Sequence, residues 1–378
     1  MPGSRTADCP IPAGGSDRRT KMLTGRPRIP VRSILLYGLW PGFIKIFLYR
    51  LKGYRIGKGV SIGLGSVLCG DRVEVGDYTS FGFLTIVRGK DVTLGPYVQI
   101  GSMTFIDTPY IVIGEGTKIN ENVFVGGLQF PDSRFVVGRN CQIQQMSFLN
   151  PAPSIVIGDD SGIGGHCLMF GHSSFQNYFD GYEVKFGPIE IGSGVGLAWR
   201  VFVLPGTTIG DGTMVGANSL VSGTLPPQSM AVGYPARVVG RPPVFPRNVS
   251  NEDKVEMFRD VVSQMSRFFV GSGLDCDKHG NCYEIRKPRS NWRLGRKSWR
   301  MQVTDRDVRE EVPGLGTARL DVFLSLCEIP EDVREVLRSR RVAWIDVAKK
   351  EQSRISNDLG DEVSSFLKRY GVRTLRRD

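Results

Sequence analysis

The sequence predicts a mainly β protein built around a β-solenoid of triangular cross-section, about eight coils long. Two observations predict it. Aliphatic residues recur every six positions between residues 56 and 225, and sets of three such positions restart at 75, 94 and 113, a step of 19. A period of six suits three short strands per coil, each pointing one aliphatic side chain inward, whereas a helical period does not.

The inward positions can be followed along the chain, coil after coil. They are Ile56, Ile62, Leu68, Val75, Phe81, Val87, Leu94, Ile100, Ile106, Ile113, Ile119, Val125, Val137, Ile143, Leu149, Ile157, Ile163, Met169, Ile191, Leu197, Val203, Ile209, Val215 and Val221. A glycine often follows the inward residue, as in Ile111-Val-Ile-Gly114, which suits a corner with no room for a Cβ. At about 4.8 Å per stacked strand, the coils form a prism on the order of 40 Å long.

The last coils contain a set of short motifs in a fixed order. They are Pro188-Ile-Glu-Ile-Gly192, Val203-Leu-Pro-Gly-Thr-Thr-Ile-Gly-Asp-Gly212, Val215-Gly-Ala-Asn-Ser-Leu-Val221, Pro226-Pro227 and Gly233-Tyr-Pro-Ala-Arg237. This order resembles the sugar and polysaccharide O-acetyltransferases of the hexapeptide-repeat acyltransferase family, over roughly residues 50–242. The resemblance implies a left-handed parallel β-helix, a homotrimer, and acetyl-CoA as the acyl donor.

Charge and cysteine usage limit the classes of function. The net charge is +11, but residues 1–55 carry +9 and residues 56–250 carry −2, so the basic charge is confined mainly to the N-terminal end. This distribution disfavours nucleic-acid binding by the whole protein. Seven cysteines with neither a metal-type CxxC pair nor a secretion signal indicate a reducing, cytoplasmic protein. No metal site is predicted.

The segment before the solenoid has two parts. Residues 1–25 are polar and rich in Gly, Pro and Arg, and are expected to be disordered. Residues 26–55 predict two short amphipathic helices interrupted by Pro41-Gly42, and the uncharged run 34–44 is too short for the about 20 residues that span a bilayer. These helices either cap the first coil or contact a membrane surface through residues 26–52, and one segment can do both.

The six-residue period ends near Arg237. The solenoid domain is assigned to 56–242, residues 243–250 are a linker, and residues 251–378 are predicted to form a small α/β domain of unknown role. Residues 276–282, which begin and end with cysteine, are interpreted as a hairpin turn instead of a zinc site. The basic segment 286–300, with Trp292 and Trp299, is either a solvated face or a contact for an anionic acceptor, a phospholipid surface or nucleic acid.

The candidate active site lies where the period is interrupted, at loop 172–187, which is treated as the only such loop. It opens on His172, one of three histidines in the chain. Acyl transfer to a hydroxyl needs a general base, and histidine suits that role near neutral pH. The resemblance implies a catalytic histidine at this place. We therefore predict His172 as the base. Four further residues are predicted to bind the acceptor or to orient His172: His166, Asp180, Tyr182 and Glu183.

The donor positions come from the resemblance alone. It implies that acetyl-CoA lies beside the last coils, in the groove between adjacent prisms of the trimer. The matching positions are Ala198, Trp199, Gly216, Ala217, Ser222 and Arg237. Many relatives have Val-Trp-Ile-Gly where this chain has Val195-Gly-Leu-Ala198, and here the indole falls at Trp199.

The sequence thus predicts an acetyl-CoA-dependent O-acetyltransferase that acts on a sugar hydroxyl of a cell-surface polysaccharide or of its lipid-linked precursor. The expected location is the cytoplasm, with peripheral contact at the inner face of the cell membrane. The alternatives are an N-acyltransferase acting on an amino sugar and a solenoid scaffold without activity. A carbonic-anhydrase-like protein needs three histidine ligands on zinc, and the solenoid contains two histidines.

Overall fold

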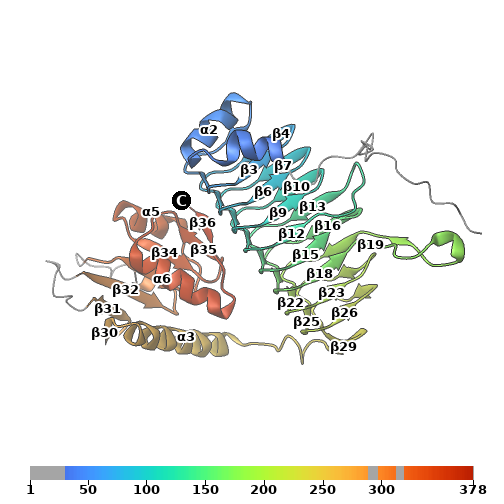
Figure 1. Cartoon of the computed structure of the whole chain (residues 1–378). Helices are drawn as coiled ribbons and strands as arrows, with labels where there is room; N and C mark the ends of the chain where they lie inside the picture. Colours follow the sequence, from blue (N-terminus) through green and yellow to red (C-terminus); the bar gives the residue numbers. More distant parts are fainter. Residues whose placement is uncertain (1–29, 288–296, 312–318, 378) are drawn as a thin grey trace, which may run out of the picture.

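The computed structural model describes residues 30–287, 297–311 and 319–377. The tail 1–25, the start of the 26–55 segment and Trp292 lie outside the described residues. A long prism of stacked coils runs from the helices at the N-terminal end to β29, and a separate α/β domain lies beside it (Figure 1). The predicted fold class is therefore confirmed.

Three parallel sheets form the walls of the prism, in the repeating pattern typical of a left-handed β-helix. Sheet A contains β1 (Arg55–Ile56), β4 (Arg72–Val75), β7 (Asp91–Leu94), β10 (Tyr110–Ile113), β13 (Arg134–Val137), β16 (Ser154–Ile157), β21 (Ile189–Ile191), β24 (Thr208–Ile209) and β27 (Thr224–Leu225). Sheet B contains β2 (Ser61–Ile62), β5 (Ser80–Phe81), β8 (Gln99–Ile100), β11 (Lys118–Ile119), β14 (Gln142–Ile143), β17 (Gly162–Ile163), β22 (Gly196–Leu197), β25 (Met214–Val215), β28 (Met230–Gly233) and the antiparallel β29 (Ala236–Gly240). Sheet C contains β3 (Val67–Cys69), β6 (Ile86–Arg88), β9 (Phe105–Asp107), β12 (Phe124–Val125), β15 (Phe148–Asn150), β18 (Leu168–Phe170), β23 (Phe202–Val203) and β26 (Leu220–Val221).

The interior of the prism is the predicted aliphatic ladder. All 24 inward positions named from the sequence are buried. Each sits directly above its counterpart one coil earlier, as Ile113 does above Leu94, so every coil buries its inner face only against its neighbours. Buried threonine hydroxyls at the corners donate to carbonyls of the next coil, for example Thr117 Oγ1 to Gly138 O at 2.7 Å.

Three corners join the sheets, and we name them by the sheets that they connect. The AB corner includes Tyr78, Tyr97, Asn140 and Asp160, and the BC corner includes Leu84, Met103, Met146, His166 and Arg200. All of these residues have a positive φ, between 53° and 60°. The turn requires this left-handed conformation in every coil, and side chains other than glycine therefore adopt it repeatedly.

The CA corner contains two excursions, not one. Most coils cross this corner in two or three residues, but residues 126–133 and residues 171–188 leave it as longer loops. The expectation of a single interruption was therefore wrong. The shorter loop was visible in the sequence as a step of 24 between Ile113 and Val137 instead of 19; it was missed because the flanking positions remain aliphatic.

A helical cap covers the open N-terminal end of the prism. It consists of α1 (Val31–Ser33), the π-helix η1 (Ile34–Gly38) and α2 (Gly42–Leu51). Lys45 and Tyr49, on the face of α2 that points to the prism, are fully buried. The Lys45 ammonium donates to Gly63 O at 2.7 Å and to Ser66 O at 3.1 Å, and Tyr49 Oη accepts from Leu68 N at 3.0 Å. The first coil has no preceding coil to pair with, so these side chains satisfy its backbone.

We expect Tyr49→Phe to destabilise the cap. The substitution leaves the buried Leu68 N–H without an acceptor, which costs roughly 1–3 kcal/mol. Two measurements check this. The thermal midpoint should fall, and the hydrogen-exchange rate of the Leu68 amide should rise. Tyr178→Phe is the matched control because Tyr178 is 65% exposed. An unchanged exchange rate at Leu68 would show that the Tyr49 hydroxyl does not protect this strand.

Within the described residues, no single helix has the length and apolar character to cross a membrane. The segments Val31–Gly38 and Gly42–Leu51 meet that test only when taken together, and they are bent by 116° relative to each other.

The C-terminal domain is a seven-stranded mixed sheet with helices on both faces. Its elements are α3 (Asn251–Gly271), β30 (Asp275–His279), β31 (Cys282–Arg286), β32 (Ser298–Thr304), α4 (Val308–Glu311), β33 (Val322–Ser325), α5 (Glu331–Ser339), β34 (Ala343–Asp346), β35 (Glu351–Ser353), α6 (Asp358–Leu367), η4 (Lys368–Tyr370) and β36 (Leu375–Arg377). Helices α3 and α6 pack on one face through Phe269 and Val363, and α5 covers the other face at Trp344. Residues 276–282 form part of the β30–β31 hairpin, as predicted.

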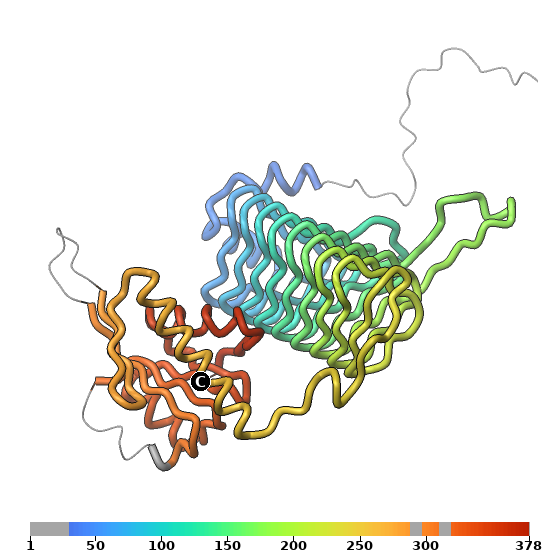
Figure 2. The backbone as a smooth tube through the Cα atoms, turned by 90° about the horizontal axis from the view of Figure 1, so that it is seen from below, coloured from blue at the N-terminus to red at the C-terminus, as the bar shows by residue number. Residues whose placement is uncertain are grey.

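This domain docks on the AB corner through its last strand. Arg377 forms a bidentate ion pair with Glu115 at 2.8 and 3.0 Å, and Asn140 Nδ2 donates to Arg373 O at 3.1 Å. A further ion pair joins Lys350 to Asp160 at 3.3 Å. In a triangular prism the AB corner lies opposite sheet C, so the docked domain leaves the outer face of sheet C open (Figure 2).

Candidate active site

Loop 172–187 forms an arm that projects from the CA corner, on the side away from the C-terminal domain (Figures 1 and 2). Its two ends are held together where Gly187 N donates to Gly171 O at 2.9 Å. The short antiparallel strands β19 (His172–Ser173) and β20 (Lys185–Phe186) form its stem. Gly171 packs against the Ala152 backbone, where an added Cβ would come within 2.4 Å of Ala152 O. The base of the arm is therefore fixed to the prism.

His172 lies in this stem, half-buried between two aromatic rings. The Phe186 ring is stacked on the imidazole at a centroid distance of 6.3 Å, and Phe170 meets its edge at 6.2 Å. Burial lowers the pKa of His172 below its ordinary value. The imidazole is therefore neutral at neutral pH, which is the state that a general base requires.

The other predicted acceptor residues of the arm lie further out and are exposed. Asp180 belongs to the 3-10 turn η2 (Tyr178–Asp180), which Asn177 caps by accepting from Phe179 N at 3.1 Å. Tyr182 and Glu183 lie in the segment that returns to β20. Within the described parts of the chain, no hydrogen bond or ion pair joins His172 to Asp180 or Glu183. The tip is aromatic, with Phe179 92% exposed.

Several residues around His172 were not predicted from the sequence. Phe130, in the shorter loop 126–133, contacts Phe186 edge-on at 5.3 Å and so supports the stem of the arm. Asn150 is buried, and its side-chain amide is placed to exchange two hydrogen bonds with the Leu128 backbone, at 3.1 and 3.2 Å. The sequence signal for these residues was the long step before Val137. It indicates a second loop at the CA corner, two coils before the arm and on the same edge of the prism.

Most of the predicted donor residues gather at the BC corner of the last coils. Ala198, Trp199, Gly216 and Ala217 lie there on successive coils, beside His166. The Trp199 indole covers Gly165, where a Cβ would come within 2.6 Å of the ring, and it contacts the His166 ring at 5.8 Å.

The remaining two donor residues lie elsewhere. Ser222 follows β26, at the CA corner, and Arg237 is on β29 and exposed. His166 and His172 are therefore on opposite edges of sheet C. The structure brings His166 and the four donor positions of the BC corner together, and it keeps them away from His172 within one chain, whereas Ser222 lies at the same corner as His172.

The outer face of sheet C, between these two edges, is a continuous apolar ladder. Its outward residues pair from coil to coil: Ile86, Phe105, Phe124, Phe148, Leu168, Phe202 and Leu220. The rings of Phe105, Phe124 and Phe148 are stacked at 5.1 and 5.0 Å. Sheet B is polar at the corresponding outward positions of the same coils, such as Gln99 and Lys118.

Across residues 30–287, 297–311 and 319–377, no three His, Cys, Asp or Glu side chains are grouped so that they could hold an ion.

Parts of the chain are similar in sequence to known proteins. A protein of Staphylococcus aureus (strain MRSA252), whose assignment as an acetyltransferase is provisional, is 42% identical over 95 residues, or 25% of this chain and 41% of that protein. The galactoside O-acetyltransferase of Escherichia coli (strain K12) is 31% identical over 156 residues, or 39% of this chain and 71% of that enzyme. The chain thus spans about two fifths of the length of the first relative and most of the second. No family model matches the chain.

Solved structures with a similar arrangement include a hexapeptide-repeat-containing acetyltransferase from Vibrio cholerae in complex with acetyl coenzyme A. It is 22% identical, and the match covers 56% of this chain and 84% of that chain with a TM-score of 0.26.

A prism of six-residue repeats with a histidine on a corner loop defines the class of hexapeptide-repeat proteins. Because the galactoside O-acetyltransferase is more than 30% identical and is covered over more than two thirds of its length, the chain belongs to the hexapeptide-repeat acetyltransferase family.

Proposed function

We propose that this protein is an acetyl-CoA-dependent O-acetyltransferase that acts on a sugar hydroxyl of a cell-surface polysaccharide or of its lipid-linked precursor. The observation that carries the proposal is His172, a half-buried imidazole with a lowered pKa at the base of a corner arm. Two relatives bear acetyltransferase names, and one of them acts on galactosides. The exposed aromatic tip of the arm, with Phe175 and Phe179, suits contact with a large acceptor.

His172 acts as the general base in the proposed reaction. The neutral imidazole takes the proton of the acceptor hydroxyl while the hydroxyl oxygen attacks the thioester carbonyl of acetyl-CoA. The tetrahedral intermediate then collapses, the C–S bond breaks, and the acetyl ester is formed. The protonated imidazole returns its proton to the departing CoA thiolate, so that His172 is regenerated.

The donor is proposed to bind along the BC corner of the last coils. Small side chains at Ala198, Gly216 and Ala217 leave a smooth strip there, which suits an extended pantetheine chain, and the exposed Arg237 guanidinium suits a phosphate.

Within one chain this strip and His172 are separated by the full width of sheet C. We therefore propose a homotrimer, in which the BC corner of one copy meets the CA corner of the next. The apolar ladder on sheet C supports this arrangement, as do the exposed corner side chains Leu84, Met103 and Met146.

The reaction class can be tested by CoA release. The full chain is incubated with acetyl-CoA and a panel of acceptors containing neutral sugars, acidic oligosaccharides and amino sugars. An O-acetyltransferase releases CoA with hydroxyl acceptors and forms an ester that mild alkali removes. An alkali-stable amide on the amino sugar would favour the N-acyltransferase alternative. If none of the acceptors in the panel causes CoA release, the result would favour the scaffold without activity.

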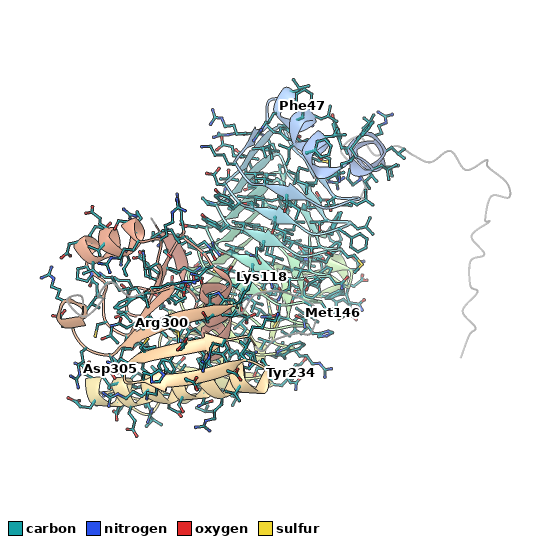
Figure 3. The ribbon with its side chains drawn as sticks, turned by 90° about the vertical axis from the view of Figure 1, so that its left-hand side faces the viewer. Phe47, Lys118, Met146, Tyr234, Arg300 and Asp305 are labelled. Carbon is teal, nitrogen blue, oxygen red and sulfur yellow. The ribbon has the colours of Figure 1, made fainter. Side chains whose placement is uncertain are left out.

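We also propose that the cap binds the cytoplasmic face of an anionic membrane. Its outward side carries eight exposed large apolar residues: Val31, Leu35, Leu36, Leu39, Trp40, Phe43, Phe47 and Leu51. Phe47 lies at the extreme end of the molecule (Figure 3). Exposed cations border this surface at Arg32 and Lys52. An apolar face with basic flanks is the pattern of helices that lie in a membrane interface.

We expect the double substitution Phe43→Glu and Phe47→Glu to reduce binding to vesicles of phosphatidylglycerol and phosphatidylcholine by about 100-fold or more, because two apolar anchors are replaced by charges. Co-sedimentation measures the effect. Substitution is preferable to deletion, since Lys45 and Tyr49 of the same helix complete the prism. Phe175→Glu with Phe179→Glu, on the equally exposed arm, is the matched control. Equal binding by the cap variant and the parent would rule out this membrane contact.

A further inference from the structure

A cleft separates the prism from the C-terminal domain. It has a volume of about 420 Å³, and both bodies line it. The prism contributes residues of the AB corner and of sheet B, including Tyr78, Tyr97 and Gln99. The domain contributes residues of α6, η4 and β36, including Ser364, Lys368 and Arg376. The cleft lies at the corner opposite sheet C, and it is therefore separate from the arm that carries His172.

The cleft lining contains two carboxylates, Glu115 and Asp361, and two cations, Lys368 and Arg376. Its two carboxylates are already paired: Arg377 holds Glu115 at 2.8 Å, and Arg376 holds Asp361 at 3.2 Å. Lys368 lines the cleft, and Lys118 lies beside it, next to the lining residue Gln99 on sheet B. No carboxylate among the described residues lies within ion-pair distance of either ammonium. Lys118 lies where the prism and the domain adjoin (Figure 3). Two cations brought together by docking repel each other unless an anion lies between them.

The electrostatics of Lys368 agree with this geometry. Its side chain is exposed at the mouth of the cleft, yet the surrounding protein desolvates its ammonium and lowers the pKa of Lys368. The neighbouring charges of Lys118 and Arg376 lower it further, and Asp361 opposes them. A bound anion would raise the pKa of Lys368 again, because an opposite charge nearby favours the protonated ammonium.

The rest of the lining suits a sugar better than a bare ion. Tyr78 and Tyr97 stack at 5.2 Å and 10°, and Tyr78 is 54% exposed, so an aromatic surface is open to the cleft. Arg376 lies over the Tyr97 ring at 5.6 Å. Gln99, Gln352 and Thr374 add amide and hydroxyl groups, and Thr374 Oγ1 donates to Gln352 Oε1 at 2.9 Å. Aromatic area with a few convergent polar groups is typical of small-molecule sites.

We propose that the cleft between the prism and the C-terminal domain is a binding site for an acidic saccharide, a sugar unit that carries a carboxylate or a phosphate. Lys118 and Lys368 bind the anionic group, and the Tyr78–Tyr97 stack contacts the sugar ring. The site needs neither acetyl-CoA nor His172. In a chain that modifies a polymer, such a site would hold one segment of an acidic glycan while another segment reaches the arm.

The test is calorimetric titration of the full chain, without acetyl-CoA, with three probes. They are a tetrasaccharide containing two hexuronic acids, the same tetrasaccharide after carboxyl reduction, and inorganic phosphate. We expect the acidic tetrasaccharide to bind and the reduced one to bind at least tenfold more weakly. Lys118→Gln and Lys368→Gln should each weaken binding of the acidic probe about tenfold, as expected for loss of one charge-assisted hydrogen bond at a partly exposed site. Lys254→Gln, at an exposed lysine of α3, is the matched control.

Two further measurements separate this proposal from others. Lys368→Gln relieves a repulsion and should not lower the thermal midpoint, so weaker binding cannot be ascribed to unfolding. Tyr78→Leu should weaken binding of the tetrasaccharide and leave binding of phosphate unchanged. If the parent binds phosphate as tightly as the tetrasaccharide, the site is a simple anion site and the saccharide assignment is wrong. Equal binding by parent and both lysine variants overturns the proposal. His172→Ala should bind the probe unchanged, so failure of the proposed catalysis is distinguishable from failure of this site.

Discussion

His172→Ala is expected to lower turnover by roughly 10²–10⁴, the range for loss of a positioned general base. The physical reason is that a sugar hydroxyl is a weak nucleophile until its proton is removed. The measurement is steady-state CoA release with the acceptor that the panel identifies. The KM for acetyl-CoA should change little, because the proposed donor strip lies at the other edge of sheet C.

The pH dependence gives a second readout of the same residue. Burial lowers the pKa of His172, so the neutral base persists to a pH below the about 6.5 typical of histidine. The rate should therefore fall as the pH drops through this lowered pKa, and this acid limb should disappear in His172→Ala.

His166→Ala is the matched control for this prediction. His166 lies at the exposed BC corner against Trp199, and its loss should cost less than the loss of His172. A His172→Ala variant that turns over like the parent, beside an inactive His166→Ala, would show that the base was assigned to the wrong histidine. Activity in both variants would contradict general-base catalysis by either of them.

Phe148→Glu is expected to convert the assembly into monomers and to abolish activity, with a loss of about 100-fold or more. Phe148 lies in the middle of the outward ladder of sheet C, stacked on Phe124 at 5.0 Å. A carboxylate there would be buried without a partner in the proposed interface, at a cost of several kcal/mol. The fold should survive, because the inward residue of this strand is Leu149.

Light scattering measures the mass, which should fall from three times 41.8 kDa to 41.8 kDa. The matched control is Val112→Glu, an exposed outward residue of β10 in sheet A, which should change neither mass nor activity. A monomeric parent, or a monomeric Phe148→Glu variant that keeps full activity, would contradict the proposal that the site forms between copies.

The fold of the prism could be predicted because its contacts are local in sequence. Each inward residue stacks on a residue about one coil away, as Ile119 does on Ile100, so the six-residue period is itself the contact pattern. The same reasoning located the arm, because an insertion breaks the period. It overlooked the shorter loop 126–133, since the aliphatic residues on either side continue the ladder.

The candidate site was only partly predictable. The type and place of His172 follow from the interrupted repeat and from the family motifs. Its surroundings do not, because Phe130 and Phe186 are 56 residues apart in sequence and meet only when the coils stack and bring their two loops to one corner. The separation of His166 from His172 in space could not be predicted from their spacing in the sequence either. Six residues apart in the chain, they lie on opposite edges of sheet C because one strand crosses the face between them.

The sequence by itself determined the repeating core, the number of coils, the break that carries His172 and the presence of a second domain. Only the tertiary structure decided where that domain sits and what its docking creates. Arg377 and Glu115 are 262 residues apart, and Lys368 lines a cleft beside Lys118 across the same boundary. Neither pairing leaves a periodic signal, because an interface between two independently folded bodies depends on surface shape and charge, and these are defined only after both cores have formed.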